Sequence, residues 1–202
     1  MASSGSDPIR YWFDFASPYA YFAVPGLQEI ARRHGRRIEY RPLLLFAVFR
    51  AHGIAAPLEI PARKRYFFED MARSAAFAGL PLAEPVKIPF ASHLAARLFY
   101  GLAAEQPNLA EAYVQAVLSR FFGQGEDIAS VPALQAVLGG LGVDPARAEA
   151  LIAAGRDRLS ASVEEAVAEG VIGSPYTVVD GEGYFGADRL PQIAWRLARA
   201  EK

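Results

Sequence analysis

The sequence predicts an α/β protein in which the two ends of the chain build one sheet and the middle is helical. Three observations predict this class. A strand–helix–strand pattern fills residues 9–44, helical patterns without a convincing strand run from about 61 to 170, and a strand–strand–helix pattern ends the chain. A strand, a helix and a second strand of such lengths form a right-handed unit with parallel strands. We therefore expect a βαβ unit, a helical block and a ββα unit, in that order.

The first unit begins with residues 9–15, whose aromatic and branched side chains are typical of a strand. A helix is expected from Pro18 to about Arg33, because apolar side chains recur there at helical spacing. Pro25 interrupts this helix and is expected to kink it. Residues 38–44 alternate in polarity and predict the second strand.

The middle of the chain predicts only helices. Some of them carry end signals, with Ser92 as a helix cap, Asp144 followed by Pro145 as a cap and first helical residue, and Gly79 as a stop. The candidate helices span residues 62–78, 92–105, 109–122, 132–138, 145–154 and 159–169.

Strand character returns with Tyr176–Val179, which is followed by the hairpin signal Asp180-Gly181 and a short strand over 183–185. Asp188 can cap a last helix over 189–200. A βαβ half and a ββα half around one sheet is the thioredoxin arrangement. The predicted fold is therefore thioredoxin-like, with a large all-helical insertion between the halves.

This fold divides the chain into two predicted domains. A discontinuous thioredoxin-like domain takes residues 9–58 and 171–200, and a helical insertion domain takes residues 59–170. The first residues, 1–8, are short and polar and are expected to form a disordered tail.

Composition excludes several kinds of site. The 202 residues include 21 basic and 22 acidic side chains, so the net charge of −1 does not favour nucleic acid or an acidic membrane surface. There is no cysteine, which excludes disulfides and protein thiolates and leaves a ligand as the only possible source of a thiol. No signal peptide or membrane span is expected, and the default is a soluble cytoplasmic protein.

No metal is expected either. The three histidines are His34, which suits a helix C-terminus, His52, expected in a loop, and His93, expected in a helix. Their spacing does not match a set of metal ligands.

Ser17 is the first candidate for chemistry. It lies at a strand-to-helix junction, where its hydroxyl can accept from a free backbone N–H while Pro18 begins the helix. The positive end of the helix dipole at this place favours an anion or a thiolate. Taken alone, the Ser-Pro pair favours a plain structural cap, and no Ser-His-Asp set accompanies it.

Ser174 and Pro175 directly precede the predicted third strand. A proline at a strand start marks a bend, an edge or a cis peptide bond. In a thioredoxin-like sheet this pair would lie beside Ser17, with the backbone N–H and C=O of Ser174 free to pair with an extended peptide. The alternative is an ordinary loop proline, which the residue alone favours.

Two further groups of residues could contact a ligand. The turn from Phe185 through Gly186 and Ala187 to Asp188 could bind a carboxylate with its N–H groups and an ammonium with the Asp188 side chain. The alternative for Asp188 is that it only caps the last helix. The basic run that begins at Arg63 is either a solvated face or the source of one cation for a substrate carboxylate.

Several motifs, in this order and spacing, resemble the 2-hydroxychromene-2-carboxylate isomerases. This family groups with the kappa-class glutathione transferases in the DsbA-like branch of thioredoxin folds. The resemblance covers residues 9–198. The motifs are Asp14-Phe15-Ala16-Ser17-Pro18-Tyr19, Arg41-Pro42-Leu43-Leu44-Leu45, Asp70-Met71-Ala72-Arg73, Gly173-Ser174-Pro175-Tyr176 and Gly186-Ala187-Asp188-Arg189-Leu190.

The resemblance implies glutathione as the cofactor. Ser17 would stand where redox relatives have cysteine and would hydrogen-bond the glutathione sulfur. Ser174 and a cis-Pro175 would pair with the glutathione backbone, and Phe185, Gly186, Ala187 and Asp188 would hold its γ-glutamyl end. The resemblance also makes a homodimer plausible.

The sequence departs from the family on the substrate side. The segment 46–54 is largely apolar where the family commonly has a lysine and an asparagine, and Ala91 stands where an amide is common. We expect Phe49 and Arg63 to contact the substrate, a small hydrophobic, aromatic molecule.

The predicted function is that of a glutathione-dependent isomerase of the 2-hydroxychromene-2-carboxylate isomerase type, in aromatic-compound catabolism. Two alternatives stay open. One is a kappa-type glutathione transferase, and the other is a non-catalytic thioredoxin-fold module that binds peptides.

Overall fold

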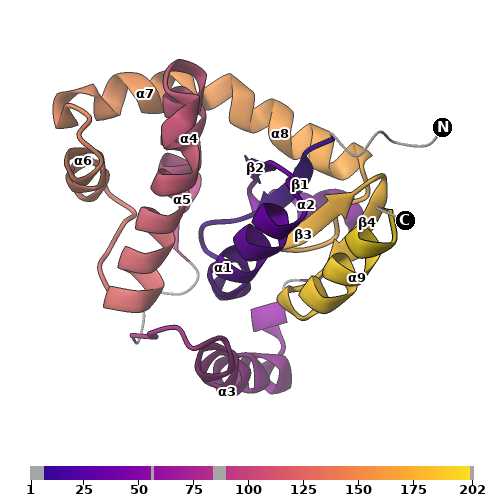
Figure 1. Ribbon diagram of the computed structural model, residues 1–202. Coiled ribbons are helices and arrows are strands. Elements are labelled where there is room, and N and C mark those ends of the chain that lie inside the picture. Colours follow the sequence, from indigo (N-terminus) through magenta and orange to yellow (C-terminus); the bar gives the residue numbers. More distant parts are fainter. Residues whose placement is uncertain (1–6, 56, 84–89, 201–202) are drawn as a thin grey trace.

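The computed structural model describes residues 7–55, 57–83 and 90–200. Most of the predicted N-terminal tail, residues 1–6, therefore lies outside the described residues. Helices surround a small sheet: α3 (Pro61–Ala78) lies below it in Figure 1, and the helices from α4 (His93–Glu105) to α7 (Ala148–Ala154) lie to its upper left.

The sheet has four strands in the order β2-β1-β3-β4. β1 (Ile9–Phe13) pairs in parallel with β2 (Ile38–Pro42) and antiparallel with β3 (Tyr176–Val179), and β3 pairs antiparallel with β4 (Glu182–Phe185). These are the βαβ and ββα halves around one sheet, so the predicted thioredoxin-like fold is confirmed. The two central strands, β1 and β3, come from the N-terminal and C-terminal parts of the chain, and Trp12 in β1 lies opposite Tyr176 in β3.

Alternation along β1 directs side chains into two separate cores. Ile9, Tyr11 and Phe13 belong to the large cluster shared with α1 (Pro18–Arg33) and α9 (Leu190–Ala200). Trp12 points to the other face, where it packs with residues of α2 (Leu45–His52) and α8 (Arg156–Ala168). The sheet is therefore covered by helices on both faces.

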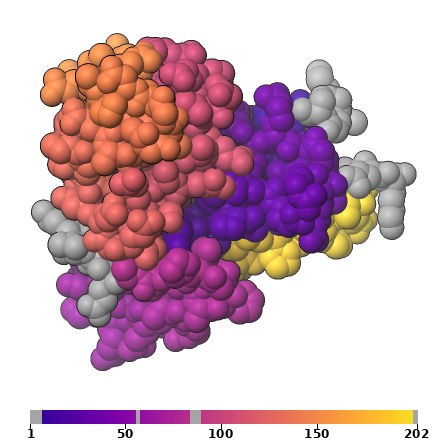
Figure 2. All heavy atoms as spheres, turned by 60° about the vertical axis from the view of Figure 1, so that its left-hand side comes forward, coloured from indigo at the N-terminus to yellow at the C-terminus, as the bar shows by residue number. Residues whose placement is uncertain are grey.

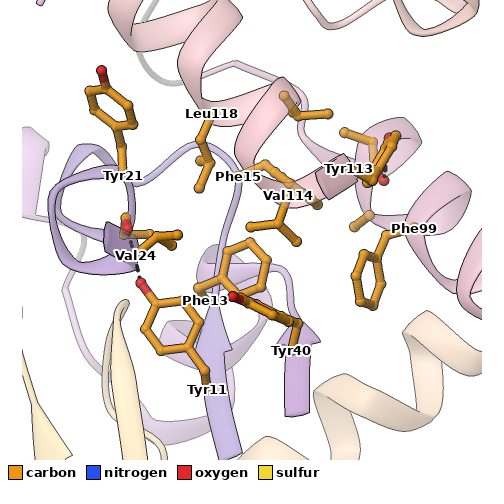
Figure 3. Close-up of a cluster of buried hydrophobic side chains, with 14 of the residues drawn as sticks. Tyr11, Phe13, Phe15, Tyr21, Val24, Tyr40, Phe99, Tyr113, Val114 and Leu118 are labelled. Carbon is orange, nitrogen blue, oxygen red and sulfur yellow. Dashed lines mark hydrogen bonds between the residues drawn. The ribbon is translucent and has the colours of Figure 1, made fainter. Parts of the chain in front are cut away.

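The large core continues from the sheet into the helical region. Phe13 and Phe15 meet edge to face with ring centroids 5.0 Å apart, and Phe15 meets Tyr113 at 5.9 Å (Figure 3). Tyr113 belongs to α5 (Ala110–Leu118), so aromatic contacts join the first strand to the predicted insertion. One buried cluster contains residues of both parts. The proposed division at residues 59 and 170 remains a prediction.

The remaining helices are α3 (Pro61–Ala78), α4 (His93–Glu105), α6 (Val131–Gly140) and α7 (Ala148–Ala154). A π-helical turn over Ser119–Gly123 extends α5. Short 3₁₀ turns occur at Pro57–Glu59, Pro107–Leu109, Pro145–Arg147 and Ala187–Arg189. In Figure 2, α3 forms a ridge along the lower side of the molecule, below the pink and orange mass of α4 to α7.

Close backbone contact joins α4 to α7. A Cβ added at Gly101 would lie 2.1 Å from the Leu151 carbonyl oxygen, and one at Gly155 would lie 1.9 Å from the Arg97 carbonyl oxygen. Only glycine at both positions allows the two helices to approach so closely.

Two sequence predictions about helices were wrong. The segment after β2 forms a helix, α2, and His52 is its last residue rather than part of a loop. Apolar side chains occur on several sides of α2 although the helix buries only Val48 and Phe49. The segment therefore lacks the helical spacing of apolar residues that would have predicted it. Ser92 precedes α4, but its side chain makes no capping bond; it bonds the Asp14 carboxylate instead.

Candidate active site

Ser17 is the N-cap residue of α1. Its backbone is extended, its Oγ accepts from the Ala20 N–H at 3.4 Å, and Pro18 is the first helical residue. The side chain is buried, with 5% of the residue exposed. The predicted capping role is therefore confirmed, and the hydroxyl lies at the positive end of the helix dipole.

Ser17 also contacts the loop before β3. The Ser174–Pro175 peptide bond is cis, and the Ser17 hydroxyl donates to the Ser174 carbonyl oxygen at 3.0 Å. The expectation that this carbonyl would be free was wrong, because two buried polar groups that face each other pair in the absence of another partner. The Ser174 N–H has no acceptor among the described residues. The Pro175 carbonyl accepts from the Gly186 N–H at 3.0 Å.

Asp14 holds this junction together. Its N–H donates to Ser174 Oγ at 2.9 Å, and its carboxylate accepts from the N–H groups of Ala16 at 2.9 Å and Leu45 at 2.8 Å and bonds the Ser92 hydroxyl. The buried carboxylate thereby ties the end of β1 to the starts of α2 and α4, and the backbone N–H of the same residue ties it to the cis-proline loop. Burial raises the pKa of Asp14, and the hydrogen bonds oppose this shift only in part.

Asp14 belongs to one of the motifs, but its sequence context predicted no role for it. The signal that could have found it is an acidic residue directly after an apolar strand. A carboxylate in such a place is expected to be buried and to need several donors.

The turn after β4 forms another wall of the site. Gly186 has φ of 108°, a conformation that favours glycine. A Cβ at Gly173 would lie 2.1 Å from the Phe185 ring, so glycine at 173 lets that ring lie against the cis-proline loop. Phe185 is half exposed, at 50%.

Asp188 does not cap the last helix, and that alternative was wrong. The chain makes a 3₁₀ turn over Ala187–Arg189 before α9 begins, and no side chain caps this turn. The Asp188 carboxylate instead accepts from Arg189 at 2.7 Å and is mostly exposed.

Two hollows meet at Ser174, next to Ser17. A groove of about 710 Å³, here called the α3 groove, runs between α1, α3 and the turn 185–189. A smaller hollow of about 240 Å³, here called the Ser17 cavity, lies over the start of α1 and the start of α2. The side chains or backbone of Tyr19, Ser174 and Phe185 line both. A ligand in the groove would therefore adjoin a ligand in the cavity.

The structure places the two predicted substrate contacts differently. Phe49 lines the Ser17 cavity together with Phe46 and Phe67. Arg63 lines a neighbouring hollow of about 390 Å³, which shares Tyr19 and Phe67 with the cavity. Phe49 and Ser17 therefore line the same cavity, whereas Arg63 lines the hollow next to it.

Tyr19 joins α1 to α3 at the mouth of the site. Its hydroxyl donates to the Asp70 carboxylate at 2.7 Å, and Arg73 pairs with the same carboxylate at 2.9 Å. Burial, with the neighbouring carboxylate, raises the pKa of Tyr19, so its hydroxyl remains a proton donor at neutral pH.

In the described ranges, no cluster of histidine, aspartate and glutamate side chains could hold a metal ion. None of the helices in these ranges is long and apolar enough to cross a membrane.

Comparison with known proteins agrees with this geometry. The DSBA-like thioredoxin domain family matches residues 8–198. The 2-hydroxychromene-2-carboxylate isomerase of Sphingobium xenophagum is 32% identical over 189 residues, which cover 90% of this chain and 93% of the relative. The chain belongs to this isomerase family, within the DsbA-like proteins.

Other members of the same group are also similar over nearly the whole chain. The glutathione S-transferase kappa 2 of Caenorhabditis elegans is 27% identical, with 96% of this chain and 93% of the relative covered. A solved structure of a 2-hydroxychromene-2-carboxylate isomerase superposes with a TM-score of 0.85 at 28% identity and covers 96% of this chain and 95% of that one. The recognition made from the motifs is thus confirmed.

Proposed function

We propose that this protein is a glutathione-dependent isomerase that acts on an unsaturated aromatic compound. One observation carries the proposal: the Ser17 hydroxyl bonds the Ser174 carbonyl where the α3 groove meets the Ser17 cavity. A tripeptide and an aromatic molecule could adjoin each other at this point, with a helix N-terminus beneath them.

The residues around the groove fit glutathione. The buried Ser174 has an N–H without an acceptor in the described part of the chain, and such a group favours a peptide carbonyl as its partner. Phe185, Gly186 and Ala187 line the groove on one side, and Asp188 presents an exposed carboxylate that suits the γ-glutamyl ammonium. Bound glutathione would supply a thiol that adds reversibly to a substrate double bond and so permits rotation about it.

Ser17 and Ser174 would exchange hydrogen bonds when the peptide binds. The Ser174 carbonyl accepts from Ser17 in the free protein and would accept from a peptide N–H in the complex. The Ser17 hydroxyl would then turn to donate to the sulfur. A donor at a helix N-terminus stabilises a thiolate and lowers the pKa of the bound thiol.

The Ser17 cavity supports an aromatic substrate. Phe46, Phe49 and Phe67 line it together with Leu45 and Leu58, so an aromatic ring would lose water against apolar walls. The cis-proline loop and Ser17 would face the reacting double bond.

The test is isomerisation at limiting glutathione. Purified protein is mixed with a cis aromatic enone and a small fraction of one equivalent of glutathione, and cis enone, trans enone and free thiol are followed together. We expect many turnovers for each glutathione, with the thiol recovered. Accumulation of the adduct would instead indicate the kappa-type transferase. Glutathione binding without turnover would indicate the binding module.

Three finer points belong to the same proposal. We propose a role in aromatic-compound catabolism, a cytoplasmic location and a homodimer. Light scattering at several protein concentrations tests the dimer, and a constant monomer mass would refute it.

A further inference from the structure

Two half-exposed phenylalanine rings lie at the rim of the Ser17 cavity. Phe46, on α2, is 48% exposed, and Phe185, at the end of β4, is 50% exposed. The other described residues that line this cavity are buried or half-buried. Large apolar side chains that remain exposed together beside a hollow are typical of a surface that a ligand covers.

The two rings lie on different sides of the reacting atoms. Phe185 lines both the α3 groove and the Ser17 cavity, and its ring lies so close to Gly173 that a Cβ there would be 2.1 Å away. Phe46 lines only the cavity and packs edge to face on Phe49, with ring centroids 6.3 Å apart. The sulfur of bound glutathione and the double bond of a substrate would therefore meet between these two rings.

The adduct of glutathione and an enone can react in two ways. When the thiolate forms a bond to the β-carbon, the electron pair of the double bond moves to the carbonyl oxygen and gives an enolate. Rotation, return of that pair and cleavage of the C–S bond release the trans enone and the thiolate. If water instead gives a proton to the α-carbon, the adduct becomes a stable conjugate, and the hydroxide that forms takes the proton that the thiol lost.

The described polar groups at the cavity walls are poor sources of a proton for the α-carbon. The Tyr19 hydroxyl donates to Asp70 at 2.7 Å, and its raised pKa makes it a weak acid. The Ser17 hydroxyl would donate to the sulfur, and the Asp14 carboxylate already accepts from two backbone N–H groups. Access of water at the rim therefore decides which product forms.

We propose that Phe46 and Phe185 keep water from the α-carbon of the adduct, and that they thereby make this protein an isomerase and not a conjugating transferase. Exclusion of water from a site prevents unwanted proton transfer to a reactive intermediate. The inference rests on the proposed function and names the residues that decide the outcome of its reaction.

The test follows the isomerisation in heavy water. cis-Benzylidenepyruvate serves as the enone, because its α-carbon carries a single hydrogen and the molecule has no other enolisable position. Deuterium reaches the α-carbon only if the adduct is protonated there, and it then appears in the released conjugate or, after elimination, in the recovered enone. Proton NMR and mass spectrometry measure both.

The exchange fraction is the labelled product divided by all product, after the reaction of glutathione alone is subtracted. We expect it to be below about a tenth for the wild type. Phe46→Ala and Phe185→Ala should each raise it about fivefold, because each removes one of the two rings. Phe185→Tyr keeps the ring and should keep the low value.

Phe68→Ala is the matched control. Phe68 is 39% exposed on α3 and lines none of the three hollows, so loss of its ring should leave the exchange fraction unchanged. Because the fraction compares products of the same turnovers, the amount of folded protein in a preparation does not alter it.

The inference is overturned if the wild type returns unlabelled thiol and trans enone but labels most of that enone, or if Phe46→Ala and Phe185→Ala label no more product than Phe68→Ala. Failure of the proposed function looks different. In that case the wild type either forms no trans enone beyond the reaction of glutathione alone or accumulates the conjugate as its main product.

Discussion

The two ends of the sheet solve the problem of buried polar groups in opposite ways. At the end far from Ser17, Arg36 and Asp180 are 3% and 4% exposed and form an ion pair at 2.9 Å, and Arg36 also donates to the Asp7 carbonyl at 2.6 Å. At the Ser17 end, buried serines bond each other, and one buried N–H is left without an acceptor among the described residues.

The far end therefore stabilises the fold, whereas the Ser17 end keeps contacts that a ligand can exchange. The far end joins Asp7 before the first strand, the α1–β2 connection and the β3–β4 turn through buried charges, and Arg196 places a second cation 3.6 Å from Asp180. The Ser17 end uses neutral hydroxyl and carbonyl groups, which a peptide can replace at small cost. Because the contacts at the Ser17 end are weak, we expect the Arg36–Asp180 ion pair at the far end to hold the strands in register.

Breaking the far end should have the largest effect on stability. Arg36→Ala leaves the buried Asp180 with only the Arg196 guanidinium, 3.6 Å away, and we expect a loss of about 3 kcal/mol in the free energy of unfolding. Arg32→Ala is the control, since Arg32 pairs with Glu29 on the surface at 73% exposure and should lose at most about 1 kcal/mol. Urea unfolding of both variants checks this, and equal losses would contradict the comparison.

Breaking the Ser17 end should lower both stability and catalysis. Ser17→Ala removes a cap and leaves the buried Ser174 carbonyl without its donor, so we expect a loss of about 2–3 kcal/mol in the free energy of unfolding. It also removes the donor that we propose for the glutathione thiolate, and kcat/KM should fall about 10- to 100-fold.

Ser130→Ala is the matched control. Ser130 caps α6 and accepts from the Ala133 N–H at 3.4 Å, the same distance as in the Ser17 cap. This variant should lose about 1 kcal/mol of stability and keep full activity. If Ser17→Ala behaved in the same way, Ser17 would be a cap and nothing more.

The Asp14 carboxyl should give the Ser17 end a pH dependence. Its pKa is raised by burial above the ordinary value of 3.8, so the folded chain holds this proton more tightly than the unfolded chain. The stability that follows is present below pH 3.8 and is lost as the pH rises through the raised pKa. Against Asp14→Asn, the wild type should lose stability from about pH 4 upward. A constant difference across urea titrations at several pH values would contradict this.

The smallest expected effect concerns the link between α1 and α3. Tyr19→Phe removes the hydroxyl that donates to Asp70, and the α3 wall of the groove loses one anchor. We expect the KM for glutathione to rise severalfold, corresponding to about 1 kcal/mol.

Tyr113→Phe supplies the control, because the Tyr113 hydroxyl donates to the Ala95 carbonyl at 3.0 Å inside the helical region. The free energy of unfolding of Tyr113→Phe should fall by about 1 kcal/mol, while its KM for glutathione stays unchanged. Steady-state kinetics at fixed enone separates the two variants, and an equal rise in KM would show that Tyr19 has no special place in the groove.

Features that depend on local chemistry could be predicted from the sequence. Alternating and aromatic runs predicted the strands, Ser17-Pro18 predicted a capped helix start, and Asp180-Gly181 predicted the hairpin, in which both residues have positive φ. The absence of cysteine determined that any thiol must come from a ligand.

Contacts between distant segments could be identified only in the folded structure. No local pattern shows that the Ser17 hydroxyl bonds the Ser174 carbonyl, that Asp14 joins four segments, or that Arg63 lies outside the Ser17 cavity. Local propensity depends on neighbours a few residues apart, whereas these contacts join residues up to 160 positions apart and exist only after the core has packed. For the same reason, the sequence could place Ser17 at a helix start, and only the fold could bring it a partner.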